Sequence, residues 1–164
     1  MLIRRARPED LEAVGEITVA AYADFTTGDD DDYINHLRNA PARYRNAELW
    51  LATSDDGATI LGSVTVCPEG SQWREIAQPG EGEFRMLSVA PAARGMGVGT
   101  ALLDLVLARF REEGVDAVVL SSLAEMSAAH RVYERAGFVR LPERDWSPVD
   151  GVNLIAYRLE LESR

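Results

Sequence analysis

Apolar positions in the first part of the chain indicate one strand and two helices. Residues 2–7 form a short β-rich run, and Pro8 then begins a segment with two carboxylates in its first turn, which suits the positive end of a helix dipole. Apolar residues recur after it at helical spacing: Leu11, Val14, Ile17, Val19, Ala20 and Ala21. A polar stretch then breaks the pattern, and Asp31 or Asp32 can cap a second short helix that ends near Ala40.

The middle of the chain has the composition of β-strands. Residues 47–54 and 59–66 are β-rich runs, and the Asp-Asp-Gly sequence between them predicts a tight turn and therefore a hairpin. Residues 68–82 are polar and interrupted by proline and glycine, so we expect a loop. The strand that follows this loop ends at Pro91.

The remaining pattern alternates helices with strands. The run after Val98 has a helical period and ends at Gly114, a suitable C-terminal cap, while residues 117–123 are nearly all apolar, as in a strand covered on both faces. Three further elements complete the chain: a helix that begins near Ser127, which can cap it, and stops at Gly137, and strands over 138–141 and 153–161. The predicted order is β-α-α-β-β-β-α-β-α-β-β.

Composition limits the classes of protein to which the chain can belong. With 164 residues and 46% apolar content, it can bury one core, so we expect a single domain over 1–164. A net charge of −10 without a basic cluster argues against a nucleic-acid partner. No apolar run approaches the roughly 20 residues that cross a bilayer, and no signal peptide is evident, so we expect no membrane association and a cytoplasmic location. The single cysteine, Cys67, fits a reducing compartment.

Three glycines at alternate positions lie where the helix after Pro91 begins. The first amides of a helix have no internal partners, and glycines at 95, 97 and 99 would let a phosphate approach them closely. The spacing fits neither a P-loop, because the lysine is missing, nor the dinucleotide fingerprint. A tight turn or close helix packing also explains glycines, but three in alternation after an arginine exceed what a turn needs. We therefore favour a phosphate-bearing ligand.

Two motifs resemble those of one enzyme superfamily. The sequence LSVAPAARGMGVGTALL resembles the acyl-CoA-binding signature of the GNAT N-acyltransferases, with Arg94, Gly97 and Gly99 at its defining positions. SAAHRVYERAGF resembles the second signature of this superfamily, Tyr-x-x-x-Gly-Phe. The resemblance implies an α/β (α+β) GNAT fold: a mixed, mostly antiparallel sheet of about seven strands, splayed between strands 4 and 5 and flanked by four helices. It also implies acetyl-CoA as co-substrate.

The resemblance assigns the donor site residue by residue. The splayed strand would offer backbone groups to pantetheine at Leu87, Ser88 and Val89. The pyrophosphate would bind the segment that comprises Arg94, Gly95, Met96, Gly97, Val98, Gly99 and Thr100. Tyr133 would protonate the departing thiolate, and Glu83 or an ordered water would accept the proton of the amine.

The chain departs from the superfamily pattern in one place. Many relatives have an asparagine seven residues before the tyrosine, where this chain has Met126. The neighbouring Ser127 can replace that contact or simply cap its helix. His130 can touch the phosphoadenosine or satisfy a surface contact, and with only two histidines we expect no metal cofactor.

These motifs do not identify the acceptor substrate. We expect an acetyltransferase acting on a small-molecule amine by direct attack in a ternary complex. A protein N-terminus or lysine remains an alternative acceptor, and a non-catalytic acyl-CoA-binding sensor an alternative function. Asp29–Asp32 can attract a cationic acceptor or form a solvated loop, and Trp73 and Trp146 can contact a substrate or cover the core. Strands at the C-terminus can pair two copies in a homodimer.

Overall fold

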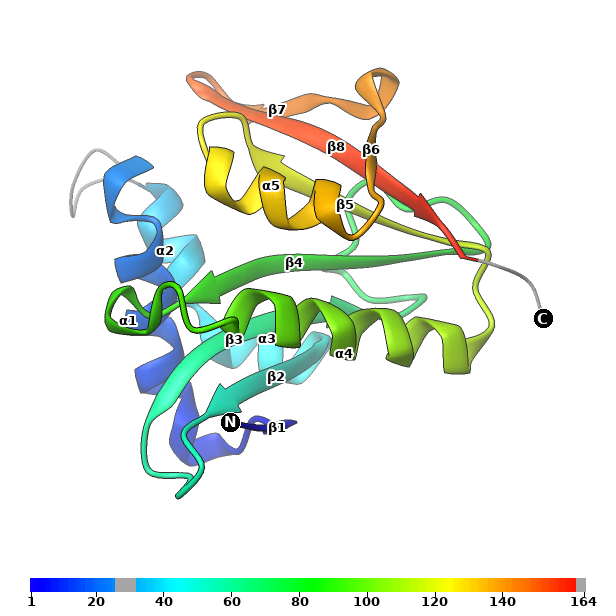
Figure 1. Ribbon diagram of the computed structural model, residues 1–164. Coiled ribbons are helices and arrows are strands. Elements are labelled where there is room, and N and C mark those ends of the chain that lie inside the picture. Colours follow the sequence, from blue (N-terminus) through cyan, green and yellow to red (C-terminus); the bar gives the residue numbers. More distant parts are fainter. Residues whose placement is uncertain (26–31, 162–164) are drawn as a thin grey trace.

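A computed structural model of the chain describes residues 1–25 and 32–161, and Asp29–Asp31 of the aspartate run lie outside the described residues. An open mixed sheet lies between two groups of helices (Figure 1): α4 and α5 cover one face, and α1, α2 and α3 cover the other. Strand residues alternate accordingly. Trp50 and Ala52 pack with the α4 group, whereas Leu49 and Leu51 pack with the α1 group.

The described residues form eight strands in the order β1-β2-β3-β4-β5-β8-β6, with β7 paired to β8. Their bounds are β1 Leu2–Arg5, β2 Glu48–Thr53, β3 Ile60–Cys67, β4 Glu81–Val89, β5 Ala117–Leu123, β6 Val139–Arg140, β7 Trp146–Val149 and β8 Val152–Glu160. All pairs are antiparallel except β4 with β5. The mixed, mostly antiparallel sheet is confirmed, with eight strands where the sequence predicted about seven.

The additional strand, β7, lies in a segment predicted as loop. Trp146 pairs with Leu154 and Val149 with Val152, so β7 and β8 form a hairpin. Pro148 interrupts the strand pattern and cannot donate a ladder hydrogen bond, which is tolerated here because β7 lies at the edge of the sheet. This proline is the reason that the sequence did not predict the strand.

The described residues form five α-helices where the sequence predicted four. Their bounds are α1 Leu11–Ala21, α2 Asp32–Arg38, α3 Ala40–Asn46, α4 Val98–Glu113 and α5 Ser127–Arg135. The helix predicted to end near Ala40 corresponds to α2, and α3 was not predicted. Pro41 lies in the first turn of α3, and Asn39 caps that helix by accepting a hydrogen bond from the Ala42 amide. In the described part of the chain, no helix has the length and apolarity needed to cross a membrane.

Strands β4 and β5 separate part-way along their length. Their parallel register runs from Glu81 opposite Ala117 to Phe84 opposite Leu120, and β4 then continues to Val89 without β5 as a partner. Met86 has a positive φ of 54°, beside a register shift between β3 and β4, which is the geometry of a β-bulge. The predicted splay is therefore present, and it leaves one backbone edge of β4 unpaired.

The bulge changes the faces to which successive β4 side chains point. Arg85 and Met86 both contact Trp73 or its cluster on the α1 side. Leu87 and Val89 pack on the α4 side, so the free segment of β4 contributes to both faces of the sheet.

Candidate active site

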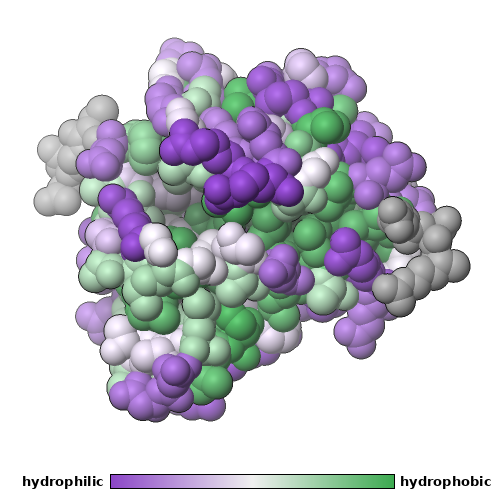
Figure 2. Space-filling model, in the orientation of Figure 1, coloured by the Kyte–Doolittle hydropathy of each residue, from purple (hydrophilic) through white to green (hydrophobic). Residues whose placement is uncertain are grey.

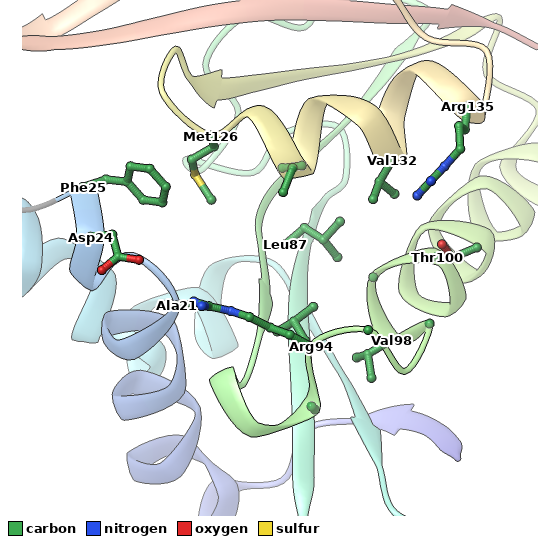
Figure 3. Close-up of a pocket in the computed structure, with 17 residues that line it drawn as sticks. Ala21, Asp24, Phe25, Leu87, Arg94, Val98, Thr100, Met126, Val132 and Arg135 are labelled. Atoms are coloured by element: carbon green, nitrogen blue, oxygen red, sulfur yellow. The ribbon is translucent and has the colours of Figure 1, made fainter.

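A cavity of about 660 Å³ opens where β4 splays from β5, between the first turn of α4 and α5 (Figure 3). It contains eight of the residues predicted for the donor site: Leu87, Val89, Arg94, Gly95, Gly97, Val98, Gly99 and Thr100. The remaining lining residues are Ala21, Asp24, Phe25, Ala93, Met126, Ala128, Ala129, Val132 and Arg135. We call this the first cavity. Figure 2 shows apolar surface exposed between α4 and α5, with hydrophilic residues around it.

The start of α4 forms the amide-rich side of the first cavity. Gly97 is the N-cap, with φ 81°, and the first hydrogen bond of the helix runs from the Ala101 amide to the Gly97 carbonyl at 3.0 Å. The preceding amides of the first turn have no acceptor within a helix. A Cβ placed on Gly95 or Gly97 would have no atom within 4 Å, so both glycines face open space. This arrangement suits an anion.

Two arginines add positive charge to the first cavity from opposite sides. Figure 3 shows Arg94 extending from the glycine segment toward the end of α1, and Arg135 extending from α5 toward α4. Both residues are exposed. Sequence reasoning missed Arg135, because nothing in the motif around Tyr133 marks it as a ligand and only the packing of α5 beside α4 brings it here.

The predicted pantetheine segment reaches the first cavity through alternate side chains. Leu87 and Val89 line it. Ser88 points to the other face, where its buried hydroxyl donates to the Met86 carbonyl at 3.1 Å, so only its backbone remains available. Met96 does not line the cavity either, and its side chain is exposed to solvent.

Tyr133 lies in the core beside the first cavity rather than in its wall. The residue is 4% exposed, and its ring packs against Phe84, Phe138 and Tyr157 at centroid distances of 6.0–6.1 Å. Burial raises the pKa of its hydroxyl strongly, and the charge of Tyr22 adds to that effect. The raised pKa keeps this hydroxyl protonated near neutral pH, and the hydroxyl makes no hydrogen bond to another described residue.

His130 and Ser127 do not reach the first cavity. The His130 ring is buried against β5, with Nε2 3.2 Å from the Ser122 hydroxyl and 3.0 Å from the Leu123 carbonyl, and burial lowers its pKa. Ser127 is the first residue of α5, and the cap position belongs to Met126, which makes no side-chain cap bond. The predicted cap is wrong because the first hydrogen bond of the helix runs from the His130 amide to the Met126 carbonyl at 3.2 Å, which places Ser127 inside the helix. Met126, not Ser127, lines the cavity.

Glu83 lies on the opposite face of the sheet, fully buried. Its Oε1 accepts hydrogen bonds from three consecutive amides, those of Glu75, Ile76 and Ala77, at 2.9–3.0 Å. Its Oε2 is buried without a partner. Burial raises the pKa of this carboxyl, and the hydrogen bonds from the three amides offset only part of that rise. Glu83 lines neither the first cavity nor the second one described next, so the geometry does not bring the predicted base into contact with open space.

A second, much smaller cavity lies at the same opening between β4 and β5 on the α1 side. Its volume of about 20 Å³ suits a single water molecule. Its lining residues are Tyr22, Tyr33, Glu75, Arg85, Met86, Ser121, Ser122, Leu123 and Leu154. Sequence reasoning selected none of these for a role, because they come from four separate elements (α2, β4, β5 and β8), from the residue after α1 and from a loop, and form no motif.

An ion pair dominates this second cavity. The Arg85 guanidinium Nε lies 2.8 Å from Oε1 of Glu75, and burial raises the pKa of Glu75 to about 7 although Arg85 opposes the shift. Trp73 lies beneath Arg85, with the guanidinium 5.2 Å from its ring. Trp146 donates to the hydroxyl of Ser121 at 3.2 Å. Each tryptophan therefore contacts a residue that lines this cavity.

Comparison with known proteins identifies the family. The model of the Acetyltransferase (GNAT) family matches residues 11–138. The chain belongs to this family. The match spans the first cavity's glycine segment and extends through Tyr133 to Phe138, so the GNAT resemblance of both motifs is confirmed.

Curated relatives of this GNAT chain include several mycothiol acetyltransferases. The protein of that name from Cellulomonas flavigena is 37% identical over 135 residues, which is 73% of this chain and 38% of the relative. The one from Sanguibacter keddieii is 44% identical over 102 residues, 58% of this chain and 31% of the relative. The chain thus spans about a third of the length of these relatives.

Solved structures share the fold along the whole chain. A GNAT-family acetyltransferase from Staphylococcus aureus has a TM-score of 0.76 and 20% identity, covering 98% of this chain and 99% of that one. A putative acetyltransferase from Salmonella typhimurium, solved with its cofactor acetyl-CoA, has a TM-score of 0.68 and 23% identity, covering 100% and 95%. These likenesses confirm the GNAT fold.

Proposed function

We propose that this GNAT domain transfers an acetyl group from acetyl-CoA to a small-molecule primary amine by direct attack in a ternary complex. One observation supports this most strongly: consecutive residues of β4 line the two cavities, which lie on opposite faces of the sheet. Leu87 lines the first cavity and Met86 lines the second. A thioester arriving along the first cavity therefore ends beside a polar chamber on the other face.

The first cavity supports binding of the donor in two parts. The diphosphate binds the amides from Gly95 to Thr100, with Arg94 and Arg135 supplying positive charge. The pantetheine arm lies along Leu87 and Val89 and pairs with the backbone edge of β4 that β5 leaves free. No contact is proposed for His130, because its ring is held against β5.

Tyr133 is the proposed general acid. As the carbon–sulfur bond breaks, its hydroxyl gives a proton to the coenzyme A thiolate. Its place beside the first cavity, with its ring packed against Phe84 where the pairing of β4 with β5 ends, supports this role. Its high pKa makes it a weak acid, so it assists departure of the thiolate without being essential to it.

Support for a small-molecule acceptor comes from the narrow α1 side of the splay, where the second cavity has room for about one water molecule rather than for the acceptor itself. The names of the curated relatives, which refer to mycothiol, point the same way. A peptide acceptor would need an open groove leading to the same point.

The experiment is a panel of amines scored by thiol release from acetyl-CoA and from longer acyl donors. It includes small primary amines, amino acids and peptides with free N-termini. Turnover with small amines supports the proposal, and turnover confined to peptides contradicts the acceptor class. Stabilisation by acetyl-CoA with no thiol release from any amine would instead favour a non-catalytic acyl-CoA sensor.

A further inference from the structure

Two glutamates lie close together on the α1 side of β4, and only one of them lines open space. We propose that Glu75 accepts the proton of the attacking amine, through a water in the second cavity, and that Glu83 is a positioning residue that holds the Glu75 loop in place. This inference rests on the proposed acetyl transfer and concerns the group that activates the acceptor.

The contacts of Glu83 suit a structural anchor better than an exchangeable base. One carboxylate oxygen is saturated by three amides of residues 75–77, and the side chain is completely buried. The first of those amides belongs to Glu75 itself, at 3.0 Å. A carboxylate that ties three successive amides of an irregular segment fixes the backbone of that segment. Glu83 therefore determines where Glu75 stands.

Glu75 has the access that Glu83 lacks. Its side chain is 18% exposed and lines the second cavity, together with the hydroxyl-bearing residues Ser121 and Ser122 and the two tyrosines. A water bound there would have several polar partners, as an ordered buried water requires. Met86 lines this cavity, and the next residue of β4, Leu87, lines the first cavity. An amine that attacks a thioester at the splay from the α1 side would therefore lie between the thioester and Glu75.

The charged surroundings of Glu75 support a proton acceptor that operates near neutral pH. Burial raises its pKa to about 7, Arg85 opposes this shift, and the negative charge of Glu83 adds to it. Arg85 is in turn 3.4 Å from the ring of His36, whose pKa burial lowers to about 4, so that histidine is neutral at pH 7. Tyr22 and Tyr33 complete the titratable groups that line the cavity.

The proton balance is simple. The ammonium form of the acceptor gives one proton through the water to Glu75, which later releases it to solvent as the net proton of the reaction. The neutral nitrogen then forms the carbon–nitrogen bond, and the carbon–sulfur bond breaks. The thiolate takes a proton from Tyr133, and the second proton of the nitrogen, lost through solvent, replaces it.

The test compares Glu75→Gln, Glu83→Gln and the control Glu69→Gln, which removes an exposed carboxylate from the same loop. We expect kcat/KM of the unaltered protein to fall as the pH drops below about 7. Glu75→Gln should reduce kcat/KM about 100-fold and abolish that acidic limb. Glu83→Gln should keep the limb but shift it to lower pH, because a neighbouring negative charge is gone. Glu69→Gln should change neither.

The opposite result would overturn the assignment. If the acidic limb of the pH profile survives in Glu75→Gln and disappears in Glu83→Gln, then Glu83 is the base. A second measurement does not depend on turnover. A carboxyl signal that titrates near pH 7 in the nuclear magnetic resonance spectrum should be missing from Glu75→Gln. If that signal titrates near pH 4, the inference fails even if acetyl transfer is demonstrated. If no amine is acetylated while the signal titrates near 7, the proposed function fails instead.

Discussion

Replacing Gly97 by alanine tests whether the mouth of α4 binds the diphosphate of acetyl-CoA. Gly97 has φ 81°, and an added Cβ would meet no protein atom within 4 Å, so the methyl group would project into open space beside the first-turn amides. The substitution therefore combines two effects, backbone strain and obstruction of the ligand. The first affects folding, and the second affects binding.

Each effect has an expected size. A non-glycine residue in the left-handed region costs roughly 1–2 kcal/mol, which for a chain of this length lowers the unfolding midpoint by about 2–8 °C. A hydrogen bond to a charged group contributes about 1.5–3 kcal/mol, so loss of one amide contact to the diphosphate weakens binding about 10- to 100-fold.

The substitution Gly114→Ala provides a matched control at the other end of α4. Its φ is 84°, an added Cβ there also meets open space, and it does not line the first cavity. Calorimetric titration with acetyl-CoA, after a thermal scan of both variants, should show similar loss of stability but weaker binding only for Gly97→Ala. If both variants bind acetyl-CoA as tightly as the unaltered protein, the amide site at α4 is refuted.

Two further predictions concern the general acid and the acid stability of the fold. Tyr133→Phe should slow thiol release about 10- to 100-fold while leaving acetyl-CoA affinity unchanged, because the ring packing stays and only the proton donor is lost; equal turnover would exclude the hydroxyl from the reaction. The hydrogen bond from Arg4 lowers the pKa of Asp10, so the ionised carboxylate stabilises the fold above about pH 4, and this stabilisation disappears as the pH falls through the lowered pKa. Urea unfolding should therefore find Asp10→Asn less stable than the unaltered chain at pH 7, with the difference shrinking toward pH 2, and a constant difference would contradict the assignment.

Local signals in the sequence determined much of the fold. The β2–β3 hairpin, the limits of α4 and the whole of β5 were predicted because each carries its own periodicity and its own terminator, such as Gly114 at the end of α4. The glycine segment also indicated an anion site, since the conformation it needs is a property of those few residues. Asn39 and Pro41 were equally local signals for the start of α3, which the prediction overlooked.

Only the tertiary structure decided which side chains share a space. Arg135 reaches the first cavity because α5 packs beside α4, and the bulge at Met86 turns Arg85 and Met86 to the same face of the sheet. Glu75 comes from an irregular segment with no period, so its position depends on the three amides that Glu83 holds. Periodicity tells which face of an element is buried, but the partner across that face lies far along the chain. The proposal of Glu75 rather than Glu83 as the base therefore required the folded backbone.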